Sequence, residues 1–78
     1  MPTIFWIGPY RFFFYAGDRG EPVHVHVERD SMVAKFWLSP VRLHHSKGFG
    51  RPELNRIRGL IEENRQRIEE EWYAYFGN

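Results

Sequence analysis

The chain has 78 residues, of which 42% are hydrophobic, 18% aromatic and 27% charged, and its formal net charge is +1. This length allows one small domain, and the aromatic content excludes a disordered chain. A net charge near zero gives no general argument for nucleic-acid binding. The absence of cysteine excludes disulfides and thiolate zinc sites and favours the cytoplasm. No apolar run approaches the roughly 20 residues of a membrane helix, so we expect no membrane contact. The N-terminus has no basic region before its apolar stretch and no small-residue cleavage site, so we expect no signal peptide.

Residues 1–45 predict a β-sheet, because runs rich in aromatic and β-branched residues alternate with turn signals. The predicted strands are Thr3–Ile7, Tyr10–Ala16, Val23–Arg29, Met32–Leu38 and Val41–His45. The predicted turns contain Gly8-Pro9, Gly17–Gly20, Asp30-Ser31 and Ser39-Pro40. We therefore expect an antiparallel sheet of four to five strands.

Residues 46–51 predict a loop, and residues 52–76 predict helical structure that begins at Pro52 and ends before Gly77. A continuous helix would be about 37 Å long, whereas a seven-residue strand spans about 23 Å. We therefore expect either a break near Asn64, giving two short helices, or one long helix with an exposed aromatic end. Such an end would call for a homodimer or another partner, through Trp72, Tyr75 and Phe76. The predicted fold class is α+β, with residues 1–78 forming one domain.

The turns also predict which side chains are neighbours in the sheet. A two-residue Asp30-Ser31 turn places His26 opposite Lys35 and His24 opposite Trp37. A hairpin closed by Gly17–Gly20 would place Arg11 opposite His26. One face would then carry two rows of side chains, Trp6–Arg11–His26–Lys35 and Ile4–Phe13–His24–Trp37. The opposite face is apolar and is the predicted seat of the helical segment.

The two histidines on this face predict acid–base chemistry. His24 and His26 are two residues apart on one strand, so their side chains emerge on the same side about 6.5–7 Å apart. Imidazole can both donate and accept a proton near neutral pH. We therefore predict a pair that cleaves an RNA phosphodiester without metal or cofactor, with Lys35 and Arg11 stabilising the phosphorane.

Three aromatic side chains of the same face, Trp37, Phe13 and Trp6, are predicted to stack on bases. The alternative interpretation of the whole face is structural, with the two histidines filling a half-covered sheet.

A metal site is a further alternative, with His24, His26 and Glu28 alternating on one strand face as ligands. Lys35 and Arg11, predicted in the same row, would repel a divalent cation. The adjacent residues His44 and His45 are predicted to point to opposite faces, so at most one of them can join a shared site.

Two segments, EPVHVHV and AKFWL, are specific enough to suggest a family, together with the C-terminal segment KGFGRPELNRIRGLIEENRQRIEEEWYAYFG. With them, nearly all of the chain resembles the small bacterial proteins of domain-of-unknown-function family 4160. The resemblance implies a component of a type II toxin–antitoxin system, and a cognate small protein encoded nearby as its partner. Matching the family's motif, His24, His26, Lys35 and Trp37 are the implied positions of interest.

The sequence therefore predicts a toxin–antitoxin component that engages RNA through the face containing His24 and His26. The competing prediction is a non-enzymatic module that binds a protein partner or a second copy of the chain.

Overall fold

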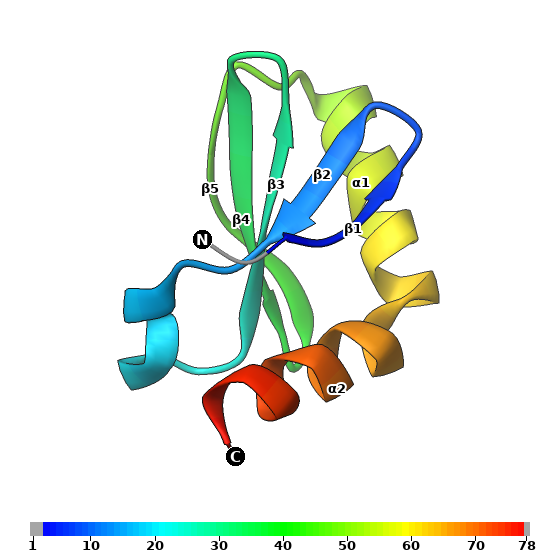
Figure 1. The fold of residues 1–78 in the computed structure, drawn as a ribbon. Coiled ribbons are helices and arrows are strands. Elements are labelled where there is room, and N and C mark those ends of the chain that lie inside the picture. The colour runs from blue at the N-terminus through cyan, green and yellow to red at the C-terminus, as the bar shows by residue number, and fades with distance from the viewer. Residues whose placement is uncertain (1–2, 78) are drawn as a thin grey trace.

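The structure, a computed structural model, describes residues 3–77. Its five strands form one antiparallel sheet in the order β1-β2-β3-β4-β5, and two helices follow the sheet (Figure 1). The elements are β1 (Thr3–Ile7), β2 (Tyr10–Phe13), the 3₁₀ helix η1 (Ala16–Gly20), β3 (His24–Arg29), β4 (Met32–Leu38), β5 (Val41–Lys47), α1 (Arg51–Glu63) and α2 (Arg65–Phe76). The α+β prediction, with an antiparallel sheet and two C-terminal helices, is confirmed. None of the helices within residues 3–77 is both long and apolar enough to cross a bilayer.

The hairpin of β3 and β4 has the predicted register, with His24 opposite Trp37 and His26 opposite Lys35. The register of β2 against β3 was predicted wrongly by two residues. Arg11 lies opposite Glu28 instead of His26, and Phe13 lies opposite His26. The reason is that β2 ends at Phe13, Phe14 and Tyr15 lie outside the strand, and η1 takes the place of the tight loop. A shift of two residues keeps each side chain on its face of the sheet, so the division into two faces survives.

The apolar face of the sheet and one side of both helices form a single core. Its strand residues are Phe5, Tyr10, Phe12, Val25, Val27, Ala34, Phe36, Leu38 and Val41, and Phe14 joins them just after the end of β2. Phe49 precedes α1, and the helices contribute Ile57, Ile61, Ile68, Trp72 and Phe76. The helical period therefore places the apolar stripe on the sheet, as amphipathic helices require.

The helix breaks at Asn64, which is one of the two outcomes that the length comparison left open. The Asn64 side chain donates a hydrogen bond to the carbonyl oxygen of Leu60 at 2.8 Å. The chain then restarts as α2, with Ile68 donating its N–H to the Asn64 carbonyl at 3.0 Å. Figure 1 shows α1 beside the sheet and α2 turning across its lower end toward η1. Arg19 of η1 donates to the Phe76 carbonyl at 3.1 Å, which fixes this end of α2.

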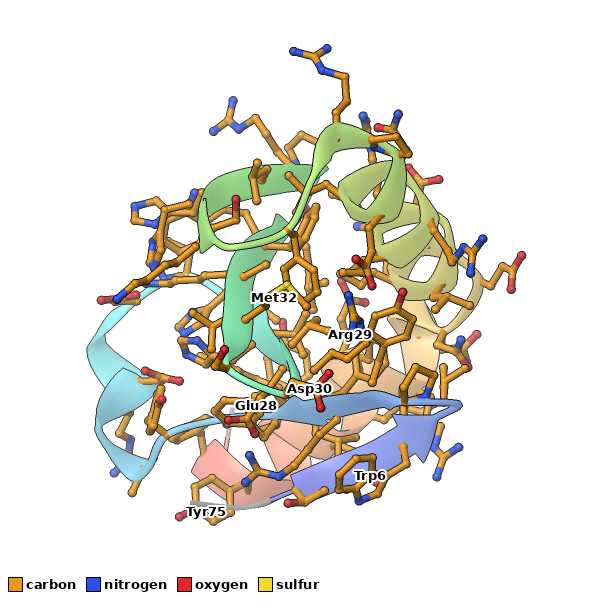
Figure 2. All side chains as sticks on the ribbon, turned by 90° about the horizontal axis from the view of Figure 1, so that it is seen from above. Trp6, Glu28, Arg29, Asp30, Met32 and Tyr75 are labelled. Atoms are coloured by element: carbon orange, nitrogen blue, oxygen red, sulfur yellow. The ribbon has the colours of Figure 1, made fainter. Side chains whose placement is uncertain are left out.

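The break buries two of the three aromatic residues that we expected to need a partner. Trp72 and Phe76 pack into the core, whereas Tyr75 remains exposed. Figure 2 shows Tyr75 and Trp6 at the outside of the molecule near β1.

Candidate functional site

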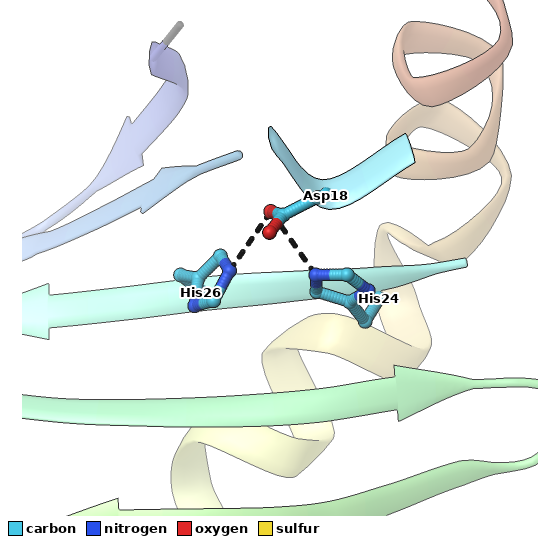
Figure 3. A group of neighbouring side chains, drawn as sticks. All are labelled: Asp18, His24 and His26. Carbon is cyan, nitrogen blue, oxygen red and sulfur yellow. Dashed lines mark hydrogen bonds and ion pairs between the residues drawn. The ribbon is translucent and has the colours of Figure 1, made fainter. Parts of the chain in front are cut away.

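Three polar side chains from η1 and β3 meet at one point beneath α2. Oδ2 of Asp18 lies 2.9 Å from Nε2 of His26 and 3.0 Å from Nε2 of His24 (Figure 3). We call Asp18, His24 and His26 the carboxylate–histidine cluster. The two histidines point the same way because they are two residues apart on β3. Asp18 joins them because η1 folds back over the strand.

His24 is fully buried, with 0% of its surface exposed. Its ring packs edge-on against Trp37, at a centroid distance of 5.6 Å, and against Trp72 of α2, at 5.0 Å. Nδ1 lies 2.8 Å from the carbonyl oxygen of Pro22, which can only accept a hydrogen bond, so Nδ1 carries a proton. Nε2 has no hydrogen-bond partner, although Oδ2 of Asp18 is near, because in the neutral ring with its proton on Nδ1 both atoms are acceptors.

His26 is better satisfied than His24. Its Nε2–H donates to the Asp18 carboxylate, and its ring stacks on Phe13 at a centroid distance of 5.3 Å. Tyr15 covers the ring edge-on at 4.6 Å. Burial lowers the pKa of His26 more than the neighbouring Asp18 charge raises it, so the imidazole is neutral near pH 7.

Asp18 is the residue of the cluster that the sequence analysis missed. Its Oδ2 accepts the backbone N–H of Tyr15 at 2.8 Å, which holds η1 in place. Burial alone would raise the pKa of Asp18, but the hydrogen bond from Tyr15 and the two histidines outweigh it, so the net shift is downward. The available signal was an aspartate in a Gly-rich turn, which favours such side chain-to-backbone bonds.

Both cations predicted beside the histidines are neutralised by other carboxylates. Lys35 pairs with Glu21, and this hydrogen bond is the main reason why the pKa of Glu21 is lowered. Arg11 pairs with Glu28 at 2.8 Å and lies over the Phe13 ring. Glu28 is therefore held away from the histidines, and Asp18 takes the place that the metal alternative gave to Glu28.

The three aromatic candidates lie in three different environments. Phe13 is buried beneath His26 and Arg11. Trp6 is 63% exposed on the edge strand β1, opposite Arg11 in the predicted register. Trp37 is half-buried on β4, where the Lys35 ammonium lies 4.8 Å from its ring centre and His44 of β5 packs edge-on. The structure therefore does not bring them together as one stacking surface.

The edge strand β5 gathers a second group of polar side chains. A bulge between the pairs Lys35–His45 and Phe36–Leu43 leaves His44 without a partner on β4. We predicted that His44 and His45 point to opposite faces, and this was wrong because of the bulge. Their Nδ1 atoms lie 2.7 Å apart. We call Trp37, Arg42, His44, His45 and Lys47 the β5 surface.

The β5 surface lies in a segment without acidic residues. Residues 31–52 contain Lys35, Arg42, Lys47 and Arg51 but no aspartate or glutamate. Arg42, His44, His45 and Lys47 are all exposed. Loss of hydration, then the charges of Lys35 and His45, lower the pKa of His44, so its ring is neutral at neutral pH.

Comparison with protein families identifies a family for this chain. The family described as Domain of unknown function (DUF4160) matches residues 10–73. The chain belongs to this family. The DUF4160 match runs from β2 into α2, and it includes both the carboxylate–histidine cluster and the β5 surface. No curated protein and no solved structure matches this DUF4160 chain.

Proposed function

We propose that this chain binds single-stranded RNA through the β5 surface, as one component of a toxin–antitoxin pair. The observation that carries the RNA part is the set of exposed cations on the sheet edge, beside an accessible tryptophan. Backbone phosphates are recognised by such cations, and unstacked bases by aromatic rings. The toxin–antitoxin part rests on the family resemblance of the sequence.

The lysine and arginine side chains of the β5 surface, Lys47 and Arg42, form no internal ion pair within residues 3–77. Elsewhere each of several cations pairs with a carboxylate: Arg11, Arg29, Lys35, Arg58 and Arg65. A phosphate backbone can therefore approach the β5 surface without breaking an existing pair.

Aromatic groups lie next to these cations. Trp37 is opposite Arg42 in the register, and its ring centroid is 4.9 Å from that of His44. A base that stacks on Trp37 would place its phosphates beside Arg42. This combination of a stacking ring and a basic track is what sequence-tolerant binders of single strands use.

The geometry favours binding over cleavage by the two histidines. His24 is fully buried between Trp37 and Trp72, so it cannot touch a substrate phosphate. A general acid or base must come within about 2.6–3.2 Å of the proton that it transfers. We therefore propose that RNA binds at the β5 surface and that the carboxylate–histidine cluster does not act as an acid–base pair in cleavage.

Fluorescence anisotropy with a labelled single-stranded RNA tests the proposal. The wild type should bind, and its affinity should fall as salt rises. The double variant Arg42→Ala/Lys47→Ala should bind more weakly, with a salt slope reduced by about 0.7 for each lost phosphate contact. Trp37→Ala should lose about 1–3 kcal/mol, the usual contribution of one stacked base.

Arg56→Ala is the matched control, because Arg56 is an exposed arginine of α1 that lies near Tyr10 rather than β5. Its affinity and salt slope should remain near those of the wild type. A loss in Arg56→Ala as large as that in Arg42→Ala/Lys47→Ala would contradict a defined RNA surface and indicate general charge attraction.

The protein-interaction alternative is favoured by one observation, the 63% exposure of Trp6 on the edge strand β1. Exposed tryptophans often anchor interfaces, and an open strand edge can pair with another chain. Sedimentation of the wild type and of Trp6→Ser tests this function. A dimer that Trp6→Ser dissociates would support it, whereas a monomer in both would exclude homodimerisation at β1.

A further inference from the structure

We infer that the carboxylate–histidine cluster is a binding site for one divalent transition-metal ion, with zinc as the reference ion. The ligands would be one carboxylate oxygen of Asp18 and the Nε2 atoms of His24 and His26. No two of these ligand atoms are more than 4.8 Å apart. The inference concerns the buried cluster and is independent of RNA binding at the β5 surface.

The distances fit a shared cation. Oδ2 of Asp18 lies 2.9 and 3.0 Å from the two imidazole nitrogens. Ligands bonded to zinc at about 2.0–2.2 Å stand roughly 2.9–3.5 Å apart in octahedral or tetrahedral arrangements. The two distances at Asp18 already fit this range, and the two imidazole nitrogens, which lie within 4.8 Å of each other, must come to the same spacing for both to bind one ion.

His24 provides the second, independent observation. Its Nδ1–H donates to the Pro22 carbonyl, so in the neutral ring Nε2 presents a lone pair. This buried lone pair lies 3.0 Å from the Asp18 carboxylate without a hydrogen bond. Two acceptors in contact repel each other unless a cation lies between them. A hydrogen bond from the second ring nitrogen to a backbone carbonyl is also the usual outer-shell support of a metal-binding histidine.

We predicted that Lys35 and Arg11 would repel a divalent cation at this site. In the structure, the charges of both side chains are neutralised. Lys35 is neutralised by Glu21, and Arg11 by Glu28. The shifted register also moves Arg11 away from its predicted position opposite His26. The Asp18 carboxylate is left as the uncompensated charge of the cluster.

The site is partly accessible, because the side chains of Asp18 and His26 are 12% and 14% exposed. An ion can therefore enter from the side of η1, and His26 exposes its Nε2 lone pair to the ion when the ring proton moves from Nε2 to Nδ1, which leaves the imidazole neutral. Imidazole and carboxylate ligands together suit Zn²⁺, Fe²⁺, Ni²⁺ or Cu²⁺ rather than Ca²⁺ or Mg²⁺. Three protein ligands also leave a coordination position for water, as in catalytic rather than structural zinc sites.

Titration of the full, chelator-treated chain tests the inference. Isothermal calorimetry with Zn²⁺ should show one equivalent bound, and Co²⁺ should give a visible absorption band from an ordered site. Zn²⁺ should also raise the melting temperature, because it binds the folded chain preferentially. Asp18→Asn and His26→Gln should each weaken zinc binding by more than the roughly 10–100-fold that loss of an outer-shell partner costs.

The double variant His44→Gln/His45→Gln is the matched control, because it removes the other two of the four histidines. These residues are exposed and adjacent, so they are the natural place for adventitious metal binding. The control should retain one equivalent and the cobalt band. Circular dichroism of each metal-free variant separates loss of the site from loss of the fold, which matters most for buried His24.

Three results would overturn the inference. The first is a wild type that binds no stoichiometric zinc. The second is unchanged zinc affinity in both folded variants, Asp18→Asn and His26→Gln. The third is loss of binding in the His44→Gln/His45→Gln control alone.

Discussion

The ring of Trp72 packs against the ring of His24, with their centroids 5.0 Å apart. This contact joins the last helix to the face of the sheet that carries the two histidines of β3, opposite the apolar face. It exists because the chain breaks at Asn64 and α2 crosses the end of the sheet (Figure 1). The contact turns an expected surface histidine into a buried one.

Trp72 should therefore contribute far more to stability than its exposed neighbour Tyr75. Trp72 is 4% exposed and also packs on Phe14 and Phe76, whereas Tyr75 is 48% exposed. Trp72→Ala should lower the free energy of unfolding by about 3–5 kcal/mol. Tyr75→Ala should change it by no more than about 0.5 kcal/mol. Urea denaturation measures both values, and similar losses in the two variants would contradict the position of α2.

The parts of the site that the sequence predicted depend on local rules. A two-residue turn specifies the pairing of β3 with β4, so His24 opposite Trp37 and His26 opposite Lys35 were predictable. Alternation along a strand also separates the faces, even where the register is wrong by two residues.

The parts that were missed depend on tertiary structure. The hydrogen bond from the Tyr15 N–H to Asp18 ends the strand early and brings the carboxylate over β3. Phe14 and Tyr15 have high strand propensity, so nothing local indicates that β2 ends at Phe13. Specific contacts such as this hydrogen bond outweigh propensity. The cover of His24 by Trp72 likewise follows from the direction of α2 after the break, which no local pattern encodes.

The stability of the fold should depend on pH because of Glu53, in the first turn of α1. Glu53 accepts hydrogen bonds from Arg29 at 2.6 and 2.7 Å and from Tyr10 at 2.7 Å. The Arg29 hydrogen bond, then that of Tyr10, lowers the pKa of Glu53 below its ordinary value. A lowered carboxyl pKa stabilises the folded state above the unfolded pKa, and the stabilisation is lost as pH falls through the folded pKa.

Melting temperatures of the wild type and of Glu53→Gln between pH 7 and pH 3 test this dependence. The wild type should melt higher at neutral pH, and the difference should shrink below the ordinary glutamate pKa of about 4.3. A difference that stays constant across this pH range would show that the charge of Glu53 does not contribute.

Gly48 should tolerate no side chain. Its φ is +99°, and a Cβ atom there would lie 2.5 Å from Cγ of Met32. Gly48→Ala should therefore destabilise the fold by about 1–3 kcal/mol from backbone strain alone, with the steric clash adding to it.

Gly17→Ala is the matched control, because a Cβ atom at Gly17 would meet no other atom within 4 Å. Its stability should be unchanged or slightly raised, since alanine restricts the unfolded chain. Thermal denaturation of the two variants compares them directly, and equal stability would contradict the described path of the chain after β5.

Photocrosslinking identifies the residues that contact RNA, and so tests RNA binding at the β5 surface without relying on affinity. The wild type is mixed with single-stranded RNA that contains 4-thiouridine, irradiated and digested, and the crosslinked peptides are identified by mass spectrometry. We expect crosslinks within residues 36–47, centred on Trp37 and His44, that disappear in Arg42→Ala/Lys47→Ala. Crosslinks confined to Trp6 or Tyr15, with none in that segment, would contradict RNA binding at this surface.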